Sequence, residues 1–388
     1  MPAAALSAVE DLLPHLIALR RDLHANPELG YAEHRTAARV ADELRALGVE
    51  VTSGVGGTGV VGVLRNGGST RRIGLRADMD ALPIAENTGL SYASCRQGVF
   101  HGCGHDGHTA MLLGAARHLA RTRRFDGTVV FVFQPAEEGL AGAKAMIEAG
   151  LFERFPMDEI YALHNWPELP AGEARTRPGP IMAAADRFDI LVEGRGGHAA
   201  QPHTTPDALL AASQLVAQLN TIVARRISPS SSAVLSVTRI EGGSSHNVLP
   251  AGVTLTGTVR SFAEAVQDRI EESLRSVAAG VALGSDTRID VRYNRYYPAT
   301  VNDPACAAHA LAAARIACDR ADMAEDPSFA SEDFAFLLRA RRGAYLWLGQ
   351  GRGTGDAPLH HPSYDFNDAI IGHGIAWYSA LVEARLSA

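Results

Sequence analysis

GTVVFVFQ (residues 127–134) is a nearly continuous apolar run of β-branched and aromatic residues. Such a run is typical of a strand that is buried on both faces of a helix-covered sheet. RRIGLRAD (71–78) and EIYALHN (159–165) also have the composition of strands, whereas DGHTAMLLGAARHLA (106–120) and AEHRTAARVADELRALG (32–48) have the spacing of helices. This alternation predicts an α/β fold in which a mostly parallel sheet is covered by helices.

The pattern changes near Met182. DRFDILVEGRGGH (186–198) alternates apolar and polar residues as a half-exposed strand does, and TPDALLAASQLVAQLNTIVARR (205–226) predicts one long helix. Two strands (232–243 and 252–262), a helix (263–282) and a short strand (288–294) follow. This order predicts a smaller α+β domain at residues 183–297, inserted into a larger domain formed by residues 1–182 and 298–388.

Length and composition narrow the class of protein. The chain has 388 residues, so two domains are expected, and its 46% hydrophobic and 20% charged residues are typical of a globular enzyme. A net charge of −7 argues against nucleic acid or an anionic membrane as a partner. Four cysteines are too few for a secreted disulfide framework, and the sequence shows neither a signal peptide nor an apolar run of about 20 residues. We therefore expect a cytoplasmic protein.

Metal-capable side chains are concentrated in HGCGHDGHTA (101–110), which holds three histidines, one cysteine and one aspartate. Three further segments contribute candidates, and all four lie outside the predicted insertion. Two of them follow predicted strands, where the active sites of open α/β sheets form. The candidates are Cys103 and His105, Glu137 and Glu138 in QPAEEG (134–139), His164 in EIYALHN, and His360 and His361 in LHHPSYDFND (359–368). Together they predict a metal centre.

The adjacent glutamates indicate what such a centre would do. Neighbouring side chains on an extended or turning segment point in different directions, so one carboxylate can bind a metal while the other transfers protons. Two cations about 3.5–4 Å apart can share a water molecule whose pKa they lower. An alternative is a Cys103 nucleophile activated by His105, but it leaves Glu137, Glu138 and His164 without a role.

The chain resembles one family along nearly its whole length, from RRDLHANPELGYAEHRTA (20–37) to the C-terminal helix. This family comprises the hippurate hydrolases and N-acyl-amino-acid amidohydrolases, with the auxin-amino-acid conjugate hydrolases and N-acetyldiaminopimelate deacetylases. It is related to two-metal aminoacylases and carboxypeptidases. The motifs that carry the resemblance are RADMDALP (76–83), HGCGHDGH (101–108), QPAEEG (134–139), AGAKAMIEAGLFE (141–153), LHNWP (163–167), GGHAAQPH (196–203), NVLP (247–250), GTVRSF (257–262), SEDF (331–334) and YDFND (364–368).

The resemblance implies a site that binds two divalent cations, zinc or manganese, with nickel or cobalt as alternatives. Glu137 matches the catalytic base, and Asp80 is interpreted as a residue that orients a metal ligand. The residues that match metal ligands are Cys103, His105, Glu138, His164 and His360.

The inserted domain matches a lid that in relatives also mediates dimerisation, so the resemblance implies a homodimer or higher homo-oligomer. His198 matches a lid histidine placed over the scissile carbonyl, in the same subunit or across a dimer. Asn247 and Arg260 match lid positions that contact substrate, although Arg260 is equally well explained as an ordinary charge at a strand end.

We therefore expect a metal-dependent amidohydrolase that cleaves a small N-acyl amino acid of N-benzoyl or N-acetyl type. Alternatives are a dipeptidase or carboxypeptidase of the same fold, or a non-catalytic binding protein. Some positions depart from the family pattern: His361 follows the ligand histidine, PSFA (327–330) precedes SEDF, Leu140 and Ala141 replace common glycines, and Asp78 stands where distant relatives have a metal-binding histidine.

Overall fold

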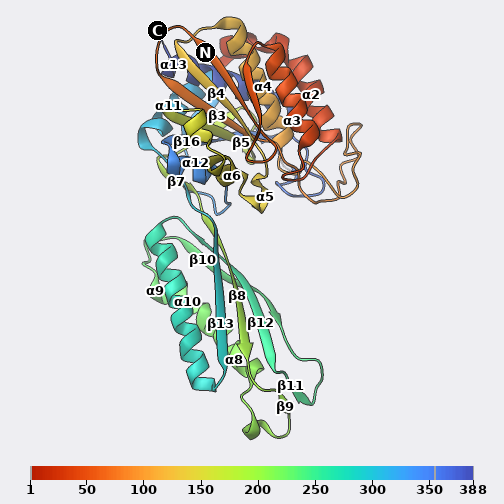
Figure 1. Cartoon of the computed structure of the whole chain (residues 1–388), viewed down its shortest axis with the longest axis vertical. Coiled ribbons are helices and arrows are strands. Elements are labelled where there is room, and N and C mark those ends of the chain that lie inside the picture. Colours follow the sequence, from red (N-terminus) through yellow and green to blue (C-terminus); the bar gives the residue numbers. More distant parts are fainter. Residues whose placement is uncertain (1, 354, 388) are drawn as a thin grey trace. The chain divides into compact units, whose positions relative to one another are not determined.

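The computed structural model describes residues 2–353 and 355–387, which form two compact units (Figure 1). The second unit comprises Met182–Thr300 and Pro327–Glu332, and the first comprises the remainder of the described chain. Each unit has a hydrophobic core of its own.

The first unit is built on an eight-stranded sheet in the order β1-β2-β4-β3-β5-β16-β6-β15. Its four central strands, β4, β3, β5 and β16, run parallel, whereas β1 and β2 pair antiparallel, as do β2 with β4 and β16 with β6. The strands are β1 (Glu50–Val55), β2 (Gly59–Asn66), β3 (Arg72–Asp78), β4 (Gly127–Gln134), β5 (Glu159–Pro170), β6 (Glu173–Thr176), β15 (Arg320–Met323) and β16 (Gly343–Gly351).

Helices cover this sheet, which confirms the α/β class expected from the sequence. The longest helices, α4 and α13, pack against each other, and α13 also packs against α11. The helices of the unit are α1 (Pro2–Ser7), α2 (Leu13–Ala25), α3 (His34–Ala46), α4 (His105–Thr122), α5 (Glu137–Leu140), α6 (Gly142–Glu148), α7 (Leu151–Arg154), α11 (Pro304–Ala317), α12 (Phe334–Ala340) and α13 (Ile371–Arg385), with short 3₁₀ turns at Glu10–Leu12 and Asp368–Ile370. Two short strands, β7 (Gly179–Met182) and β14 (Thr300–Asn302), pair with each other.

The two faces of the central strands have different chemistry. Leu75, Phe133 and Leu163 belong to the apolar core, together with residues of α4 and α13. Because side chains alternate along a strand, their neighbours Gln134 and His164 lie on the opposite face, as do Arg76 and Asp78. The fold thus places buried polar side chains at the carboxyl ends of parallel strands.

The second unit packs helices on one face of an antiparallel sheet in the order β10-β12-β8-β13. Its apolar core includes Phe188 and Leu255 from the sheet and Leu215 and Leu274 from the helices. The helix expected over 205–226 is two helices, which meet at Asn220. The elements are β8 (Ala184–Glu193), β9 (Gly197–His198), a 3₁₀ turn (Pro202–Thr204), α8 (Ala208–Leu219), α9 (Thr221–Arg226), β10 (Ala233–Glu241), β11 (Val248–Leu249), β12 (Gly252–Ser261), α10 (Glu264–Ser285) and β13 (Arg288–Tyr297).

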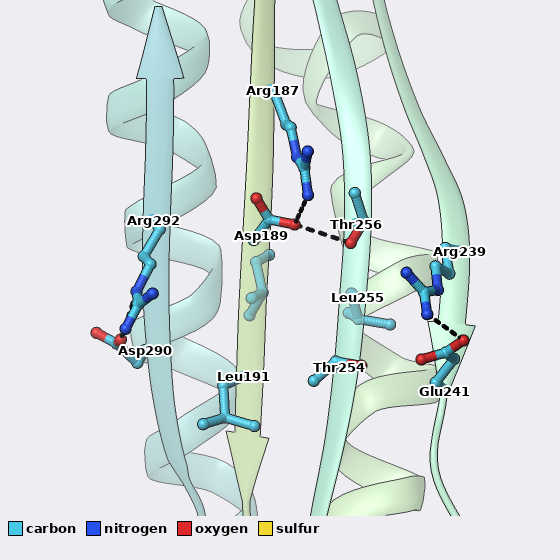
Figure 2. A pocket seen from close by; sticks show the side chains of 11 residues that line it. Arg187, Asp189, Leu191, Arg239, Glu241, Thr254, Leu255, Thr256, Asp290 and Arg292 are labelled. Atoms are coloured by element: carbon cyan, nitrogen blue, oxygen red, sulfur yellow. Dashed lines mark hydrogen bonds and ion pairs between the residues drawn. The ribbon is translucent and has the colours of Figure 1, made fainter.

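The other face of this sheet is polar and lines a shallow pocket (Figure 2). Arg187 pairs with Asp189 at 2.9 Å, and Asp189 also accepts a hydrogen bond from Thr256. Arg239 and Glu241 form a second ion pair on β10. The charges follow the alternation seen in the sequence, so the sheet has one buried face and one solvated face.

In the part of the chain that the structure describes, we find no helix with both the length and the apolar character required to cross a membrane.

Candidate metal centre

The cysteine, histidine and glutamate side chains of four separate segments of the first unit converge around the sulfur of Cys103. Cys103 Sγ lies 3.4 Å from His164 Nε2 and 3.3 Å from His360 Nε2. Glu138 Oε1 lies 3.3 Å from His360 Nε2 and 4.0 Å from His105 Nε2. These atoms form two overlapping groups, Cys103 with His105 and His164, and Cys103 with Glu138 and His360, in each of which all ligand atoms lie within 4.8 Å of one another.

The local backbone explains how residues so far apart in sequence meet. His105 opens α4, and Gly104 before it has a φ of 92°. A Cβ on Gly104 would lie 2.5 Å from Oδ1 of Asn165 on β5, so only glycine fits at this position. His360 also has a left-handed φ of 65°, and its amide donates to Gly102 O at 2.8 Å. Left-handed non-glycine residues are uncommon, and they cluster at functional sites.

Hydrogen bonds orient two of the imidazoles. His105 Nδ1 lies 2.9 Å from the Asp80 carbonyl oxygen, and His164 Nδ1 lies 2.7 Å from the Asn165 carbonyl oxygen. Since a carbonyl oxygen can only accept, each Nδ1 carries a proton, and Nε2 is the nitrogen that would bind a cation beside Cys103 once it is deprotonated. A proton donated from the other ring nitrogen is the usual arrangement for metal-ligating histidines.

Unsatisfied buried atoms provide a test of whether a cation fits. His105 Nε2 and Glu138 Oε1 are both buried, and among the described residues neither makes a hydrogen bond, although Glu138 Oε1 lies within ion-pair distance of His360. Unpaired buried polar atoms are costly, and metal coordination would satisfy them. Thiolate, imidazole and carboxylate ligands suit first-row divalent cations. The donor set therefore fits metal binding.

The electrostatics of the site also favour the binding of a cation. Burial alone lowers the pKa of His105, but the carboxylates of Asp78, Asp80 and Glu138 outweigh it and raise that pKa to about 10. The site therefore favours positive charge. Burial, followed by the charges of Glu138 and Glu137, raises the pKa of the Cys103 thiol well above its usual value. A thiol in this environment is a poor nucleophile without a cation, which argues against the alternative of cysteine catalysis.

His108 and Asp78 lie beside the centre, and their polar atoms form hydrogen bonds with each other, with Asn165 and with Arg76. His108 Nδ1 is 2.6 Å from Asp78 Oδ1, and His108 Nε2 is 2.6 Å from Asn165 Oδ1. The other Asp78 oxygen accepts from Arg76 Nη1 at 2.6 Å. Both side chains thus belong to a hydrogen-bond network next to the centre.

Glu137 and Glu138 each contribute a carboxylate to one group with His105, and each makes further contacts of its own. The Glu138 amide donates to Asp80 Oδ2 at 3.0 Å, while Asp80 Oδ1 lies 3.3 Å from His105 Nδ1. Asp80 therefore contacts both the Glu138 backbone and the His105 imidazole. Glu137 is 7% exposed, belongs to a group with His105 and Glu138, and accepts a hydrogen bond from the Asp333 amide at 3.3 Å.

Sequence reasoning assigned no role to Arg76, although an arginine between apolar residues of a strand is a detectable signal. Arg76 is fully buried, and its guanidinium bridges Asp78 and Asp333, at 2.6 and 3.2 Å. Asp333, in the SEDF segment, also accepts a hydrogen bond from the Ala143 amide. This bridge links the end of β3 to the segments around Glu137.

The geometry distinguishes the two adjacent histidines near the C-terminus. His360 Nε2 faces Cys103 and Glu138, whereas His361 Nδ1 accepts a hydrogen bond from the Ser363 amide at 3.1 Å. His360 is therefore the member of the pair that joins the group.

The remaining candidates belong to the second unit. His198 on β9 pairs with Val248 on β11, and the neighbouring Asn247 accepts a hydrogen bond from the Ala199 amide. Arg260 lies near the other end of β12, opposite Ala185. The structure thus brings His198 and Asn247 together. The β9-β11 sheet precedes the start of β12 at Gly252, whereas Arg260 lies toward the other end of β12, about 25 Å from Gly252 at the usual rise per strand residue.

Comparison with protein families agrees with this geometry. The model of peptidase family M20/M25/M40 matches residues 74–384. The chain belongs to this family. The recognition made from the sequence motifs is confirmed, and the chain is a metal-dependent amidohydrolase.

Individual relatives cover nearly the whole chain. It is 40% identical to a hippurate hydrolase of Campylobacter jejuni, over 96% of both chains. It is 39% identical to thermostable carboxypeptidase 1 of Saccharolobus solfataricus, over 88% of this chain and 87% of the relative. Among solved structures, the Bacillus subtilis YXEP protein, a dinuclear metal-binding peptidase of the M20 family, matches with a TM-score of 0.86 and 33% identity, over 97% of this chain and 99% of that one.

Proposed function

We propose that this enzyme hydrolyses the amide bond of small N-acyl amino acids and releases a carboxylate and a free amino acid. The main support is the 40% identity to a hippurate hydrolase over 96% of both chains. Hippurate is N-benzoylglycine, so we expect N-benzoyl or N-acetyl amino acids as substrates. All four cysteines are free, which fits a cytoplasmic enzyme.

Cys103, His105, Glu138, His164 and His360 would hold two divalent cations, zinc or manganese, with nickel or cobalt as alternatives. When bound, the cations would polarise the amide carbonyl and acidify water. Glu137 would accept a proton from the attacking water and deliver it to the leaving amine. This role is supported by the place of Glu137 beside His105 and Glu138, where its carboxylate accepts a backbone hydrogen bond from Asp333.

The second unit would serve as the lid and dimerisation domain of a homodimer or higher homo-oligomer. His198, and with it Asn247, would contact the substrate carbonyl, and Arg260 would contact another part of the substrate. His198 lies in the small β9-β11 sheet beyond one end of β12, whereas Arg260 lies near the other end of β12, so a single lid would not present both to one small substrate. This separation favours a His198 that is contributed by the partner subunit.

Replacing Glu137 by glutamine tests the assignment of the base. We expect kcat to fall by about 10²–10⁴-fold, the usual contribution of general base catalysis, with unchanged metal content. Glu148→Gln is the control, because Glu148 forms an exposed ion pair with Lys144 and no other ion pair within residues 2–353 and 355–387. Near-normal turnover in Glu137→Gln would exclude Glu137 as the base.

A substrate panel tests the reaction class. Enzyme of measured metal content is assayed on N-benzoyl and N-acetyl amino acids beside dipeptides, with and without a chelator. We expect the N-acyl amino acids to be preferred in kcat/KM and the chelator to abolish the activity. Preference for dipeptides would favour a peptidase, as the likeness to a carboxypeptidase suggests. Failure to cleave any of them would favour a binding protein.

A further inference from the structure

The turn that carries Glu137 begins with a residue in an unfavourable conformation. Ala136 is left-handed, with φ 54° and ψ 45°, and it is fully buried. Residues other than glycine rarely adopt this region, and they keep it only where the surroundings hold them. The Ala136 amide donates to Glu33 Oε1 at 2.8 Å. A side chain from another segment thus holds the backbone next to the proposed base.

The Glu33 carboxylate is itself an unusual group. It is fully buried, and its other oxygen accepts a hydrogen bond of 2.5 Å from the Thr58 hydroxyl. No basic side chain within the described residues pairs with it. Burying a carboxylate without a cation is costly, so a function at this position is a reasonable explanation for its presence.

The segment that carries Glu33 contacts both ends of the turn. A Cβ on Gly30 would lie 3.0 Å from Ala136 Cα, so glycine allows the close approach. The Tyr31 hydroxyl donates to the Leu140 carbonyl oxygen at 3.1 Å. Glu33 immediately precedes α3, and its carbonyl accepts a hydrogen bond from the Ala37 amide. The segment is therefore a rigid support for residues 136–140.

We propose that Glu33 is a positioning residue for catalysis: it holds the left-handed turn at Ala136 and so directs the Glu137 carboxylate toward the reacting water. This inference rests on the proposed function, in which Glu137 is the base. Glu33 acts through the backbone and contacts neither substrate nor cation. Because Asp80 holds the Glu138 amide independently, loss of Glu33 would disturb the base more than the metal ligand.

The test compares three variants. Glu33→Met keeps the length of the side chain but removes the acceptor, and we expect kcat to fall by about 10–100-fold, the range for a misplaced catalytic group. KM and metal content should change little. Glu33→Gln retains an acceptor oxygen and should restore most of kcat. Thr58→Val is the matched control, because it removes the other partner of the same carboxylate and leaves the Ala136 bond in place.

A wild-type kcat in Glu33→Met would overturn the proposal. An equal loss of kcat in Thr58→Val would also overturn it, because it would show a purely structural role. Should Glu33→Met not fold, amide exchange in the wild-type holoenzyme decides: we expect a protected Ala136 amide, and rapid exchange would disprove a persistent bond to Glu33. The variants are assayed beside Glu137→Gln, so that an error in the assignment of the base is recognised separately.

Discussion

At the scale of single residues, the candidate centre depends on how each side chain is held. His105 and His164 direct Nε2 inward because Nδ1 of each is bound to a carbonyl oxygen. His360 reaches the group only through a left-handed backbone fixed by the Gly102 carbonyl. Ala141, where relatives commonly have glycine, is left-handed as well, with a φ of 57°.

The adjacent histidines allow a controlled test of the metal assignment. We expect His360→Ala to weaken metal affinity by at least about 10–100-fold, since removing even an outer partner of a metal ligand costs this much. His361→Ala should bind metal normally, because its Nδ1 faces the Ser363 amide. The measurement is metal content and affinity of the purified variants. The opposite result would assign the ligand to His361.

At the scale of elements, a buried ionic link joins α2 to the first turn of α4. His24 Nδ1 lies 2.9 Å from Asp106 Oδ2, and His24 Nε2 lies 3.3 Å from Glu86 Oε1. Arg20 pairs with Asp106 and with Asp368. Since Asp106 follows His105, this link connects α2 to the segment that carries a candidate ligand.

The link predicts a pH-dependent stability. Burial lowers the pKa of His24, but hydrogen bonds to Asp106 and Glu86 outweigh it and raise the pKa to about 9. A raised folded-state pKa contributes stability that is complete below about pH 6.5, the value of an unperturbed histidine, and is lost as the pH rises through 9. The difference in unfolding free energy between wild type and His24→Gln should therefore shrink by up to about 3 kcal/mol between pH 6 and pH 10.

Denaturant unfolding at several pH values measures this difference. His34→Gln on α3 is the control, because His34 is exposed and forms no ion pair among the described residues. Its difference from wild type should not vary with pH. A constant difference for His24→Gln would show that folding leaves the pKa of His24 unchanged and would contradict this prediction.

At the scale of the whole molecule, the second unit has the features of an independent domain. Its strands of entry and exit, β8 and β13, pair with each other, with Asp186 opposite Arg295 and Ala185 opposite Tyr297. Its core is formed by its own helices and sheet. Because the chain enters and leaves this unit on adjacent strands, the unit can form its core without the rest of the protein.

We predict that residues 182–300 fold when expressed alone, with a cooperative unfolding transition and a stability of about 5–10 kcal/mol. Leu274→Ala should lower that stability by about 2–5 kcal/mol, because Leu274 is fully buried on α10. Leu283→Ala on the same helix should have little effect, since Leu283 is 89% exposed. Circular dichroism with denaturant checks all three. A fragment without a transition, or equal losses, would refute independent folding.

The sequence predicted the fold class and the segments around Cys103 because both follow from local patterns. Apolar runs such as 127–134 mark buried strands, and polar residues after such strands meet at one sheet edge. The break at Asn220 was missed because the apolar spacing continues across it. The supporting roles of Glu33 and Arg76 were missed because a buried charge is explained only by its partners, which lie far away in the sequence.

One sulfur atom belongs to both groups of candidate ligands. If Cys103 is shared in this way, departure of either cation weakens the hold on the other, and partly filled enzyme should be scarce. Titration with a chelator should then remove both ions in one step. For the same reason, oxidation of this single thiol would inactivate the enzyme completely, whereas bound cations would shield it from oxidants.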